Sequence, residues 1–322
     1  MVASKVYDLR GKRIWLAGHR GMVGSAIERR LLHRGDVELL TADRQRVDLL
    51  NQAAVGGWLR EMKPDAIIVA AAKVGGILAN DSQPADFLYE NLVIASNIIG
   101  AAHAEDVDRL LFLGSSCIYP KLASQPLSED ALLTGPLEPT NEWYAIAKIA
   151  GIKLCDSYRK QYRRSYISAM PTNLYGQNDN FDLRSSHVLP ALMRRIHDAK
   201  VQSRPSVEIW GTGAPLREFM HVDDLGDACV FLMEHYDEAG PINAGSGDEI
   251  SIRGLAELIA QVVGYKGNFS FDPTKPDGTP RKVMDSSRLR AMGWERRIEL
   301  EVGIRSTYHW YLENAGRLRG AA

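Results

Sequence analysis

Residues 13–24 read RIWLAGHRGMVG, and this stretch decides the fold class. Its first part, Arg13–Ala17, is a short, mostly apolar run that is typical of a buried strand. Glycines follow at positions 18, 21 and 24, and the pattern over residues 22–34 predicts a helix. A strand, a glycine-rich turn and a helix in this order form the first unit of a parallel sheet, in which the helix N-terminus attracts phosphate.

The spacing of the glycines leaves the role of the turn open. It is G-x-x-G-x-x-G, whereas the commonest dinucleotide fingerprint is G-x-G-x-x-G, and a plain tight turn is the alternative. The strand before it and the helix after it favour dinucleotide binding, because glycine lets the backbone approach a pyrophosphate closely. We therefore expect cofactor contacts from the consecutive residues Gly18, His19, Arg20, Gly21, Met22, Val23 and Gly24.

Strand-like and helix-like segments alternate from this unit as far as residue 170. The strand candidates have a continuous rather than an alternating apolar character, as in a parallel sheet covered on both faces. They are Val37–Thr41, Ala66–Ala71, Arg109–Leu113 and Tyr166–Met170, and the long helices between them are Pro84–Ala104 and Tyr144–Arg163. The pattern predicts an α/β protein with a Rossmann-type, doubly wound parallel sheet.

The second half of the chain is less regular. Residues 171–183 are polar and rich in turn formers, 187–199 and 251–263 have helical patterns, 200–206 resemble a loop, and 273–282 are dense in proline, glycine and charge. We expect residues 1–170 to form the dinucleotide-binding domain, with a return to it at about 215–250. Residues 171–322 are expected to form mainly a smaller, substrate-binding α/β lobe, because ligands of such sheets bind beyond the strands' carboxyl ends.

Composition limits the possible partners. The chain has 322 residues, 45% of them hydrophobic, and its formal charge of −1 provides no field that would attract nucleic acid or a membrane. Cys117, Cys155 and Cys229 lack the spacing of a metal site or a disulfide framework. We see neither a long apolar span nor a signal-like start. The expectation is a cytoplasmic protein that uses no metal.

Two further segments predict the reacting groups. Tyr144 and Lys148 are four positions apart in a predicted helix, so both side chains share one face. The ammonium is expected to lower the pKa of the phenol from about 10, which would make it a usable acid and base. Ser115 follows the strand at 109–113, and its hydroxyl could join Tyr144 in donating to a substrate carbonyl. The alternatives are a surface pair for Tyr144 and Lys148, and a helix cap or turn serine for Ser115.

The choice between nicotinamide cofactors depends on residues after the second strand. Asp43 lies nineteen positions beyond Gly24, near where an acidic residue binds the ribose 2′-hydroxyl and favours NAD. Arg20 and Arg44 flank the same place, and a guanidinium suits a 2′-phosphate. We expect NADP(H), against the indication of Asp43.

The glycine loop, Ser115 and the Tyr144/Lys148 pair, in this chain order, resemble the extended short-chain dehydrogenase/reductase family. Within it, several stretches are similar to GDP-L-fucose synthases. They are residues 17–26 (AGHRGMVGSA), 70–77 (AAAKVGGI), 112–120 (FLGSSCIYP), 137–142 (LEPTNE), 144–155 (YAIAKIAGIKLC), 170–176 (MPTNLYG) and 275–282 (KPDGTPRK). The resemblance runs from about residue 12 to residue 319, and Asp43 is a departure from it.

The resemblance implies a reaction in which GDP-4-keto-6-deoxy-D-mannose is epimerised at C3 and C5 through enolates. NADPH then reduces C4, and the product is GDP-L-fucose. It implies that Cys117 is the base and His187 the acid, whereas the residues alone suggest a small buried hydrophobe and a cap or surface residue. The cofactor contacts that it implies beyond the glycine loop are Arg44, Asp48, Leu49, Leu113, Gly114, Ser115, Ser116, Lys148, Pro171, Thr172, Asn173, Leu174 and His187.

The resemblance also implies a binding set for the GDP-sugar, namely Arg195, Trp210, Arg217, Asp277 and Lys282. Arginine suits bidentate phosphate recognition. A solvated helix face remains the alternative for Arg195, and a core position remains the alternative for Trp210.

Three rival functions use the same scaffold. A 4,6-dehydratase is expected to carry a carboxylate just after the catalytic hydroxyl residue, where this chain has Ser116 and Cys117. A 4-epimerase needs no external reductant, and a silent NADP sensor usually lacks the tyrosine or the lysine. The family suggests a homodimer, in which the helices Pro84–Ala104 and Tyr144–Arg163 could form a bundle across a two-fold axis.

Overall fold

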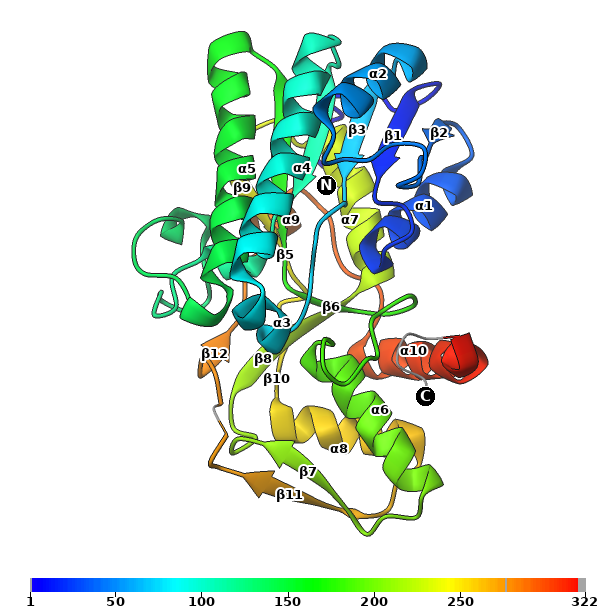
Figure 1. The fold of residues 1–322 in the computed structure, drawn as a ribbon, viewed down its shortest axis with the longest axis vertical. Coiled ribbons are helices and arrows are strands. Elements are labelled where there is room, and N and C mark those ends of the chain that lie inside the picture. The colour runs from blue at the N-terminus through cyan, green and yellow to red at the C-terminus, as the bar shows by residue number, and fades with distance from the viewer. Residues whose placement is uncertain (1, 276, 318–322) are drawn as a thin grey trace.

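The centre of the structure is a six-stranded parallel sheet in the order β2-β1-β3-β4-β5-β9 (Figure 1). The computed structural model describes residues 2–275 and 277–317, so Pro276 and the end of the resemblance at residues 318 and 319 lie outside it. The strands are β1 (Arg13–Ala17), β2 (Glu38–Leu40), β3 (Ala66–Val69), β4 (Arg109–Leu113), β5 (Ser165–Pro171) and β9 (Pro241–Ala244). The predicted α/β fold class is confirmed, and β9 is a strand that the sequence analysis did not identify.

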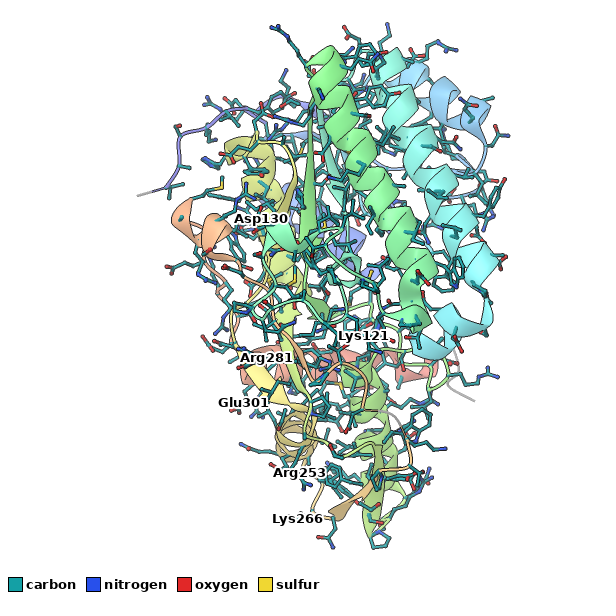
Figure 2. All side chains as sticks on the ribbon, turned by 90° about the vertical axis from the view of Figure 1, so that its left-hand side faces the viewer. Lys121, Asp130, Arg253, Lys266, Arg281 and Glu301 are labelled. Atoms are coloured by element: carbon teal, nitrogen blue, oxygen red, sulfur yellow. The ribbon has the colours of Figure 1, made fainter. Side chains whose placement is uncertain are left out.

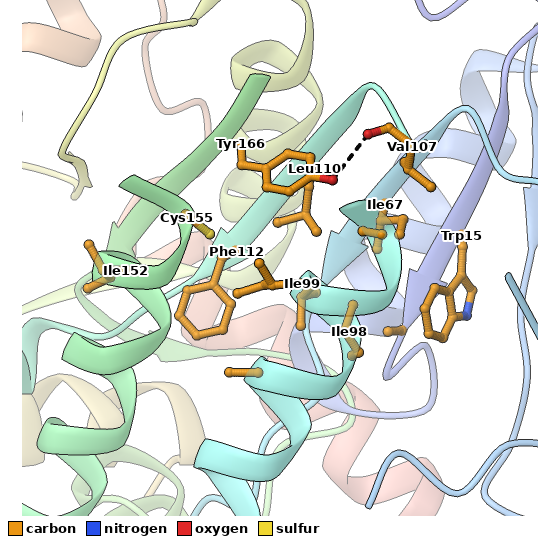
Figure 3. Packing of buried hydrophobic residues seen from close by; sticks show 14 of the residues in the cluster. Trp15, Ile67, Ile98, Ile99, Val107, Leu110, Phe112, Ile152, Cys155 and Tyr166 are labelled. Atoms are coloured by element: carbon orange, nitrogen blue, oxygen red, sulfur yellow. Dashed lines mark hydrogen bonds between the residues drawn. The ribbon is translucent and has the colours of Figure 1, made fainter. Parts of the chain in front are cut away.

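Helices cover both faces of this sheet, which explains why the strands are apolar on both sides. In β1, Trp15 and Ala17 point into one core, and Ile14 and Leu16 point into the other. The first core is closed by α2 (Gln52–Met62), α4 (Pro84–Ala104) and α5 (Glu142–Tyr162), and the second by α1 (Met22–Arg34) and α7 (Val222–His235). Figure 3 shows the first core, where Tyr166 donates to the Val107 carbonyl at 3.2 Å.

Two of these covering helices were missing from the sequence analysis. In α2, Gly56 and Gly57 are poor helix formers and conceal a helical spacing of Val55, Trp58 and Leu59 that is fully used in packing. In α7, apolar residues recur at a helical spacing that the sequence analysis did not use. Gly226 lets this helix approach α1 closely, because a Cβ at that position would lie 2.9 Å from the Ala26 carbonyl. The predicted helix Tyr144–Arg163 begins two residues earlier, at Glu142.

Much of the remaining chain forms a smaller lobe below the sheet in Figure 1. Its four-stranded sheet has the order β10-β8-β12 with β6 also paired to β8, and a separate ribbon joins β7 to β11. The strands are β6 (Asn173–Tyr175), β7 (Ser206–Trp210), β8 (Leu216–His221), β10 (Glu249–Ser251), β11 (Asn268–Asp272) and β12 (Arg281–Lys282), and the helices are α6 (Val188–Val201), α8 (Ile252–Val263) and α10 (Leu300–Asn314). The turn-rich stretch 171–183 thus contains a short strand, β6, that pairs with β8, a strand distant in sequence.

Short helices complete the described chain. They are α3 (Ile77–Ser82), α9 (Ser287–Ala291) and the 3-10 turns η1 (Ser116–Ile118), η2 (Glu129–Ala131), η3 (Pro139–Asn141) and η4 (Ala315–Arg317). In Figure 2, Lys121 and Arg281 mark the level where the central sheet meets the smaller lobe, and Arg253 and Lys266 lie on that lobe. None of the helices in the described ranges is both long and apolar enough to cross a membrane.

Candidate active site

Many of the predicted cofactor and catalytic residues follow strands at the carboxyl edge of the central sheet. Gly18 follows β1, Ser115 follows β4 and Thr172 follows β5. Chain order reverses between the neighbouring strands β1 and β3, because β2 lies on the other side of β1. The carboxyl ends beside such a reversal are where ligands of doubly wound sheets bind.

The glycine loop has a shape that only glycine allows. Gly18 has a φ of +93°, and a Cβ there would lie 2.6 Å from the backbone nitrogen of Ala71. A Cβ on Gly24 would overlap the Gly18 carbonyl. Within the described chain, the first turn of α1 contains neither an acidic residue nor a capping side chain. The loop and the helix N-terminus therefore fit the pyrophosphate of a dinucleotide.

The arginine and the aspartate that indicated different cofactors are bonded to each other. Arg20 donates to an oxygen of Asp43 at 3.0 Å. Arg44 lies 3.8 Å from Asp48, and the Leu49 carbonyl accepts from Asn97 at 2.9 Å. The residues predicted to contact the cofactor's ribose therefore lie close together. Arg20 already pairs with Asp43, so a ligand phosphate would have to share its guanidinium with that carboxylate.

Lys148 is buried beneath the site. The residue is only 4% exposed, and its ammonium donates a hydrogen bond to the Leu113 carbonyl at 2.7 Å. The ammonium also lies 5.7 Å from the ring centroid of Tyr144. Burial lowers the pKa of Lys148 to about 8, and a charge on Cys117 acts in the opposite direction.

The predicted lowering of the Tyr144 pKa is wrong. Burial raises the pKa of this phenol, and a negative charge on Cys117 raises it further. The lysine does not reverse this because its ammonium is directed to the Leu113 carbonyl. Tyr144 packs edge-on against Phe87, with ring centroids 6.4 Å apart. At neutral pH it is a neutral phenol, which suits a proton donor better than a base.

Cys117 lies at the centre of the charged groups. It belongs to η1, where the Ser115 hydroxyl accepts from the Cys117 N–H at 3.4 Å, and it is 7% exposed. Burial raises the pKa of its thiol, whereas the Lys282 ammonium, a hydrogen bond with Ser115 and the Lys148 ammonium lower it. Because Tyr144, Lys148 and Lys282 all interact electrostatically with this thiol, the fold brings together residues from η1, α5 and β12.

His187 immediately precedes α6 with extended backbone angles. Within the described chain its side chain makes no capping hydrogen bond, and it is exposed. Although the residue as a whole is exposed, the protein packed around its imidazole desolvates the charged form, and this effect and the Lys282 ammonium lower its pKa. His187 thus occupies the N-cap position of α6 at the surface without capping it through its side chain, and it interacts electrostatically with the same lysine as Cys117.

The remaining predicted cofactor residues lie on neighbouring strand ends. The Gly114 N–H donates to the Ala169 carbonyl at 2.9 Å, and the Thr172 N–H donates to the Ala244 carbonyl at 3.1 Å. Asn173 donates to the Glu218 carbonyl at 2.8 Å. Ser116 is buried in η1, Pro171 ends β5, and Leu174 lies in β6. These bonds attach the end of β5 to β9 and β8.

The predicted nucleotide contacts lie on the smaller lobe. Trp210 is 45% exposed, which excludes the core alternative. The guanidinium carbon of Arg195 lies 5.4 Å from its ring centroid, and the Lys275 ammonium lies 5.8 Å from it. An exposed indole flanked by two cations can stack on a base and attract its phosphates. Lys275 was quoted in a motif but was not assigned to the site.

Arg217 and Lys282 form a second cationic pair. They are register partners on β8 and β12. Burial lowers the pKa of Lys282, and the Arg217 charge lowers it further, although Cys117 acts against both. Burial lowers the pKa of Arg217, and the Asp277 charge acts in the opposite direction. The Asp277 carboxylate also accepts hydrogen bonds from the backbone N–H and the hydroxyl of Thr212, at 2.7 and 2.8 Å. The pair presents positive charge between the thiol and the nucleotide surface.

Sequence reasoning missed Glu218, which organises this region. It is fully buried, and its carboxylate accepts from the Gly247 and Met284 N–H groups at 2.7 and 2.8 Å. Its backbone carbonyl holds Asn173. Burial raises its pKa, and these hydrogen bonds act in the opposite direction. The only sequence signal was a charged residue within a strand, β8. Its role could not be predicted because its hydrogen-bond partners are far away in the sequence.

No group of three or more histidine, cysteine, aspartate or glutamate side chains that could hold a metal occurs in residues 2–275 and 277–317.

Comparisons with known proteins agree with this geometry. Residues 14–245 match the NAD dependent epimerase/dehydratase family. The chain is 58% identical to a GDP-L-fucose synthase of Sinorhizobium fredii over 96% of this chain and 98% of that protein. It is 57% identical to a GDP-L-fucose synthase of Escherichia coli over 96% of this chain and 99% of that protein. The crystal structure of a GDP-L-fucose synthetase from Naegleria fowleri bound to NADP superposes with a TM-score of 0.88 at 26% identity, over 99% of this chain and 100% of that one.

Proposed function

We propose a function for this chain from the premise that it belongs to the NAD dependent epimerase/dehydratase family and, within it, to the GDP-L-fucose synthases. The chain converts GDP-4-keto-6-deoxy-D-mannose to GDP-L-fucose. It epimerises C3 and C5 and then reduces C4 with NADPH. The observation that carries the proposal is the buried Cys117 thiol among Tyr144, Lys148 and Lys282, because it adds a base to a reductase site.

The reduction needs a proton donor and a means of stabilising charge at O4. NADPH, held by the Gly18–Gly24 loop, supplies the hydride when it is bound. Tyr144 is neutral at neutral pH because of its raised pKa, so it can donate a proton to O4. Ser115 donates a second hydrogen bond to the same oxygen. The Lys148 ammonium, 5.7 Å from the ring centroid of Tyr144, adds a positive charge near the phenolate that remains, although its bond to the Leu113 carbonyl leaves the pKa of the phenol raised.

The epimerisation uses the same oxygen. Protons on C3 and C5 are acidic because both carbons are adjacent to the C4 ketone, and the anion spreads onto O4. Ser115 and Tyr144 stabilise this enolate. Cys117 removes the proton as a thiolate. Burial raises the pKa of its thiol, and the Lys282 and Lys148 ammonium groups act against that rise. His187 returns a proton on the opposite face. One oxyanion pocket therefore serves both reactions.

The smaller lobe is proposed to hold the GDP moiety. Trp210 offers an exposed ring, with Arg195 and Lys275 beside it for phosphate. Arg217 and Lys282 then place positive charge between the nucleotide and the reacting carbons. Residues 171–322 thus act mainly in substrate binding, and residues 1–170 act in cofactor binding.

Incubation with GDP-4-keto-6-deoxy-D-mannose and NADPH tests the proposal. GDP-L-fucose, identified by NMR, should form with one NADPH oxidised for each sugar. A 4-epimerase would oxidise none, and a silent sensor would bind NADPH without oxidising it. Tyr144→Phe should lose the reduction by about 10²-fold or more, because the proton donor is gone. The matched control is Tyr158→Phe on the same helix, which should retain full turnover.

We further propose that the chain works as a homodimer in the cytoplasm. The long helices α4 and α5 pack side by side (Figure 1). They carry exposed apolar side chains, including Tyr89, Trp143 and Ile146. Exposed apolar side chains that form a contiguous patch are typical of surfaces that become covered. The three cysteines of the chain are free, which suits a reducing compartment. Light scattering after gel filtration should give twice the chain mass, and Ile146→Glu should shift it to the monomer.

A further inference from the structure

Asp43 holds a fixed negative charge beside the glycine loop. It lies three positions after the end of β2, at the carboxyl edge of the sheet. One carboxylate oxygen accepts from the Arg46 backbone N–H at 3.0 Å, and the other accepts from Arg20 at 3.0 Å. Because both oxygens are engaged in different directions, the carboxylate cannot turn away from the loop without losing a bond.

The surrounding charges are balanced. Arg20 faces Asp43, and Arg44 faces Asp48 at 3.8 Å, so each guanidinium already has an acidic neighbour. The Arg46 side chain pairs with Glu61 at 2.9 Å. A 2′-phosphate, with a charge of about −2, would bind Arg20 only with the Asp43 carboxylate beside it. A ribose 2′-hydroxyl would instead donate a hydrogen bond to that carboxylate.

We propose that Asp43 admits NADH as a second reductant, so that this chain accepts both nicotinamide cofactors. The inference rests on the proposed function only in that the reaction which NADH would drive is the one proposed above. In this arrangement Arg20 serves the 2′-phosphate of NADPH, and Asp43 serves the ribose hydroxyl of NADH. The competing interpretation is that Asp43 only caps the turn at residues 44–46.

Asp43→Asn separates these interpretations, because asparagine can still accept from the Arg46 N–H but carries no charge. The dissociation constants of NADH and NADPH are measured by titration of nicotinamide fluorescence, without any sugar substrate. A parallel titration compares 2′,5′-ADP with 5′-AMP, two probes that differ in the 2′-phosphate. The control is Asp8→Asn, which removes an exposed aspartate that pairs with Arg10 at 2.8 Å before β1, at the opposite edge of the sheet.

The readout is the ratio of the NADH to the NADPH dissociation constant. We expect a ratio below about 30 in the wild type, and a rise of at least about tenfold in Asp43→Asn, since a charged hydrogen bond is lost to NADH and a repulsion is lost to NADPH. The 2′,5′-ADP preference over 5′-AMP should rise in the same variant, and Asp8→Asn should change neither value. A wild-type ratio above about 30, or a smaller rise, overturns the proposal. A protein that binds both cofactors but forms no GDP-L-fucose would instead contradict the proposed function.

Discussion

Replacing Lys148 with methionine is expected to stabilise the protein at neutral pH while removing its reductase activity. Burial holds the Lys148 pKa at about 8, against an ordinary value of 10.5, so folding works against its protonation. That difference corresponds to about 3 kcal/mol. Methionine avoids this cost but leaves the Leu113 carbonyl without its donor, which costs about 1 kcal/mol. The net expectation is a gain of about 2 kcal/mol, or roughly 3 °C in Tm for a chain of this length.

The gain should depend on pH in a defined direction. Below pH 8 the lysine is charged in both the folded and the unfolded state, so the full cost is present. Between pH 8 and 10.5 the unfolded lysine binds a proton that the folded one does not, and wild-type stability therefore rises with pH relative to the variant. Near pH 10.5 the advantage of methionine should be gone.

The assay is thermal unfolding of the wild type and the variant at pH 7 and pH 10, with NADPH oxidation measured alongside. Lys153→Met is the matched control, because Lys153 lies on the same helix with a half-exposed side chain near Asp156. It should change Tm by less than about 1 °C at either pH. A lower Tm for Lys148→Met at pH 7, or a Tm difference that does not shrink at pH 10, would refute the reasoning.

Four other outcomes are expected. NADPH oxidation should fall as pH rises through about 8, where Lys148 loses its charge, and an unchanged rate at pH 9 would contradict a role for the ammonium. Cys117→Ser should lose C3 and C5 proton exchange in heavy water, measured by NMR, while cofactor binding persists. Gly24→Ala should weaken NADPH binding by about tenfold or more, because the added Cβ overlaps the Gly18 carbonyl; calorimetry measures this. Trp210→Ala should raise the KM for the GDP-sugar by about tenfold with little change in kcat, and the reverse pattern would exclude a binding role.

Much of the site was predictable because its residues follow local patterns. The strand, turn and helix around Gly18–Gly24 are encoded within a few residues, and so is the helical spacing of Tyr144 and Lys148. The position of Ser115 after a buried strand was enough to place it at the ligand-binding edge. In contrast, the family resemblance, and not the residue pattern, assigned Cys117 and His187.

The pKa values could not be predicted in this way. The Tyr144–Lys148 spacing suggested a lowered phenol pKa, yet burial raises it, and the lysine ammonium is directed to a carbonyl on β4. Burial depends on which elements close over a side chain, and these elements come from distant parts of the chain. The same holds for Glu218, whose hydrogen-bond donors lie 29 and 66 positions away.

The sequence alone therefore determined the parallel α/β fold and the glycine loop, because these depend on apolar periodicity and on conformations that only glycine adopts. Only the tertiary structure decided that Cys117 interacts with Tyr144, Lys148 and Lys282, and that Asp43 pairs with Arg20. Electrostatic interactions act through space and depend on burial, so distances and desolvation determine their sign and strength. Neither quantity is local in the chain.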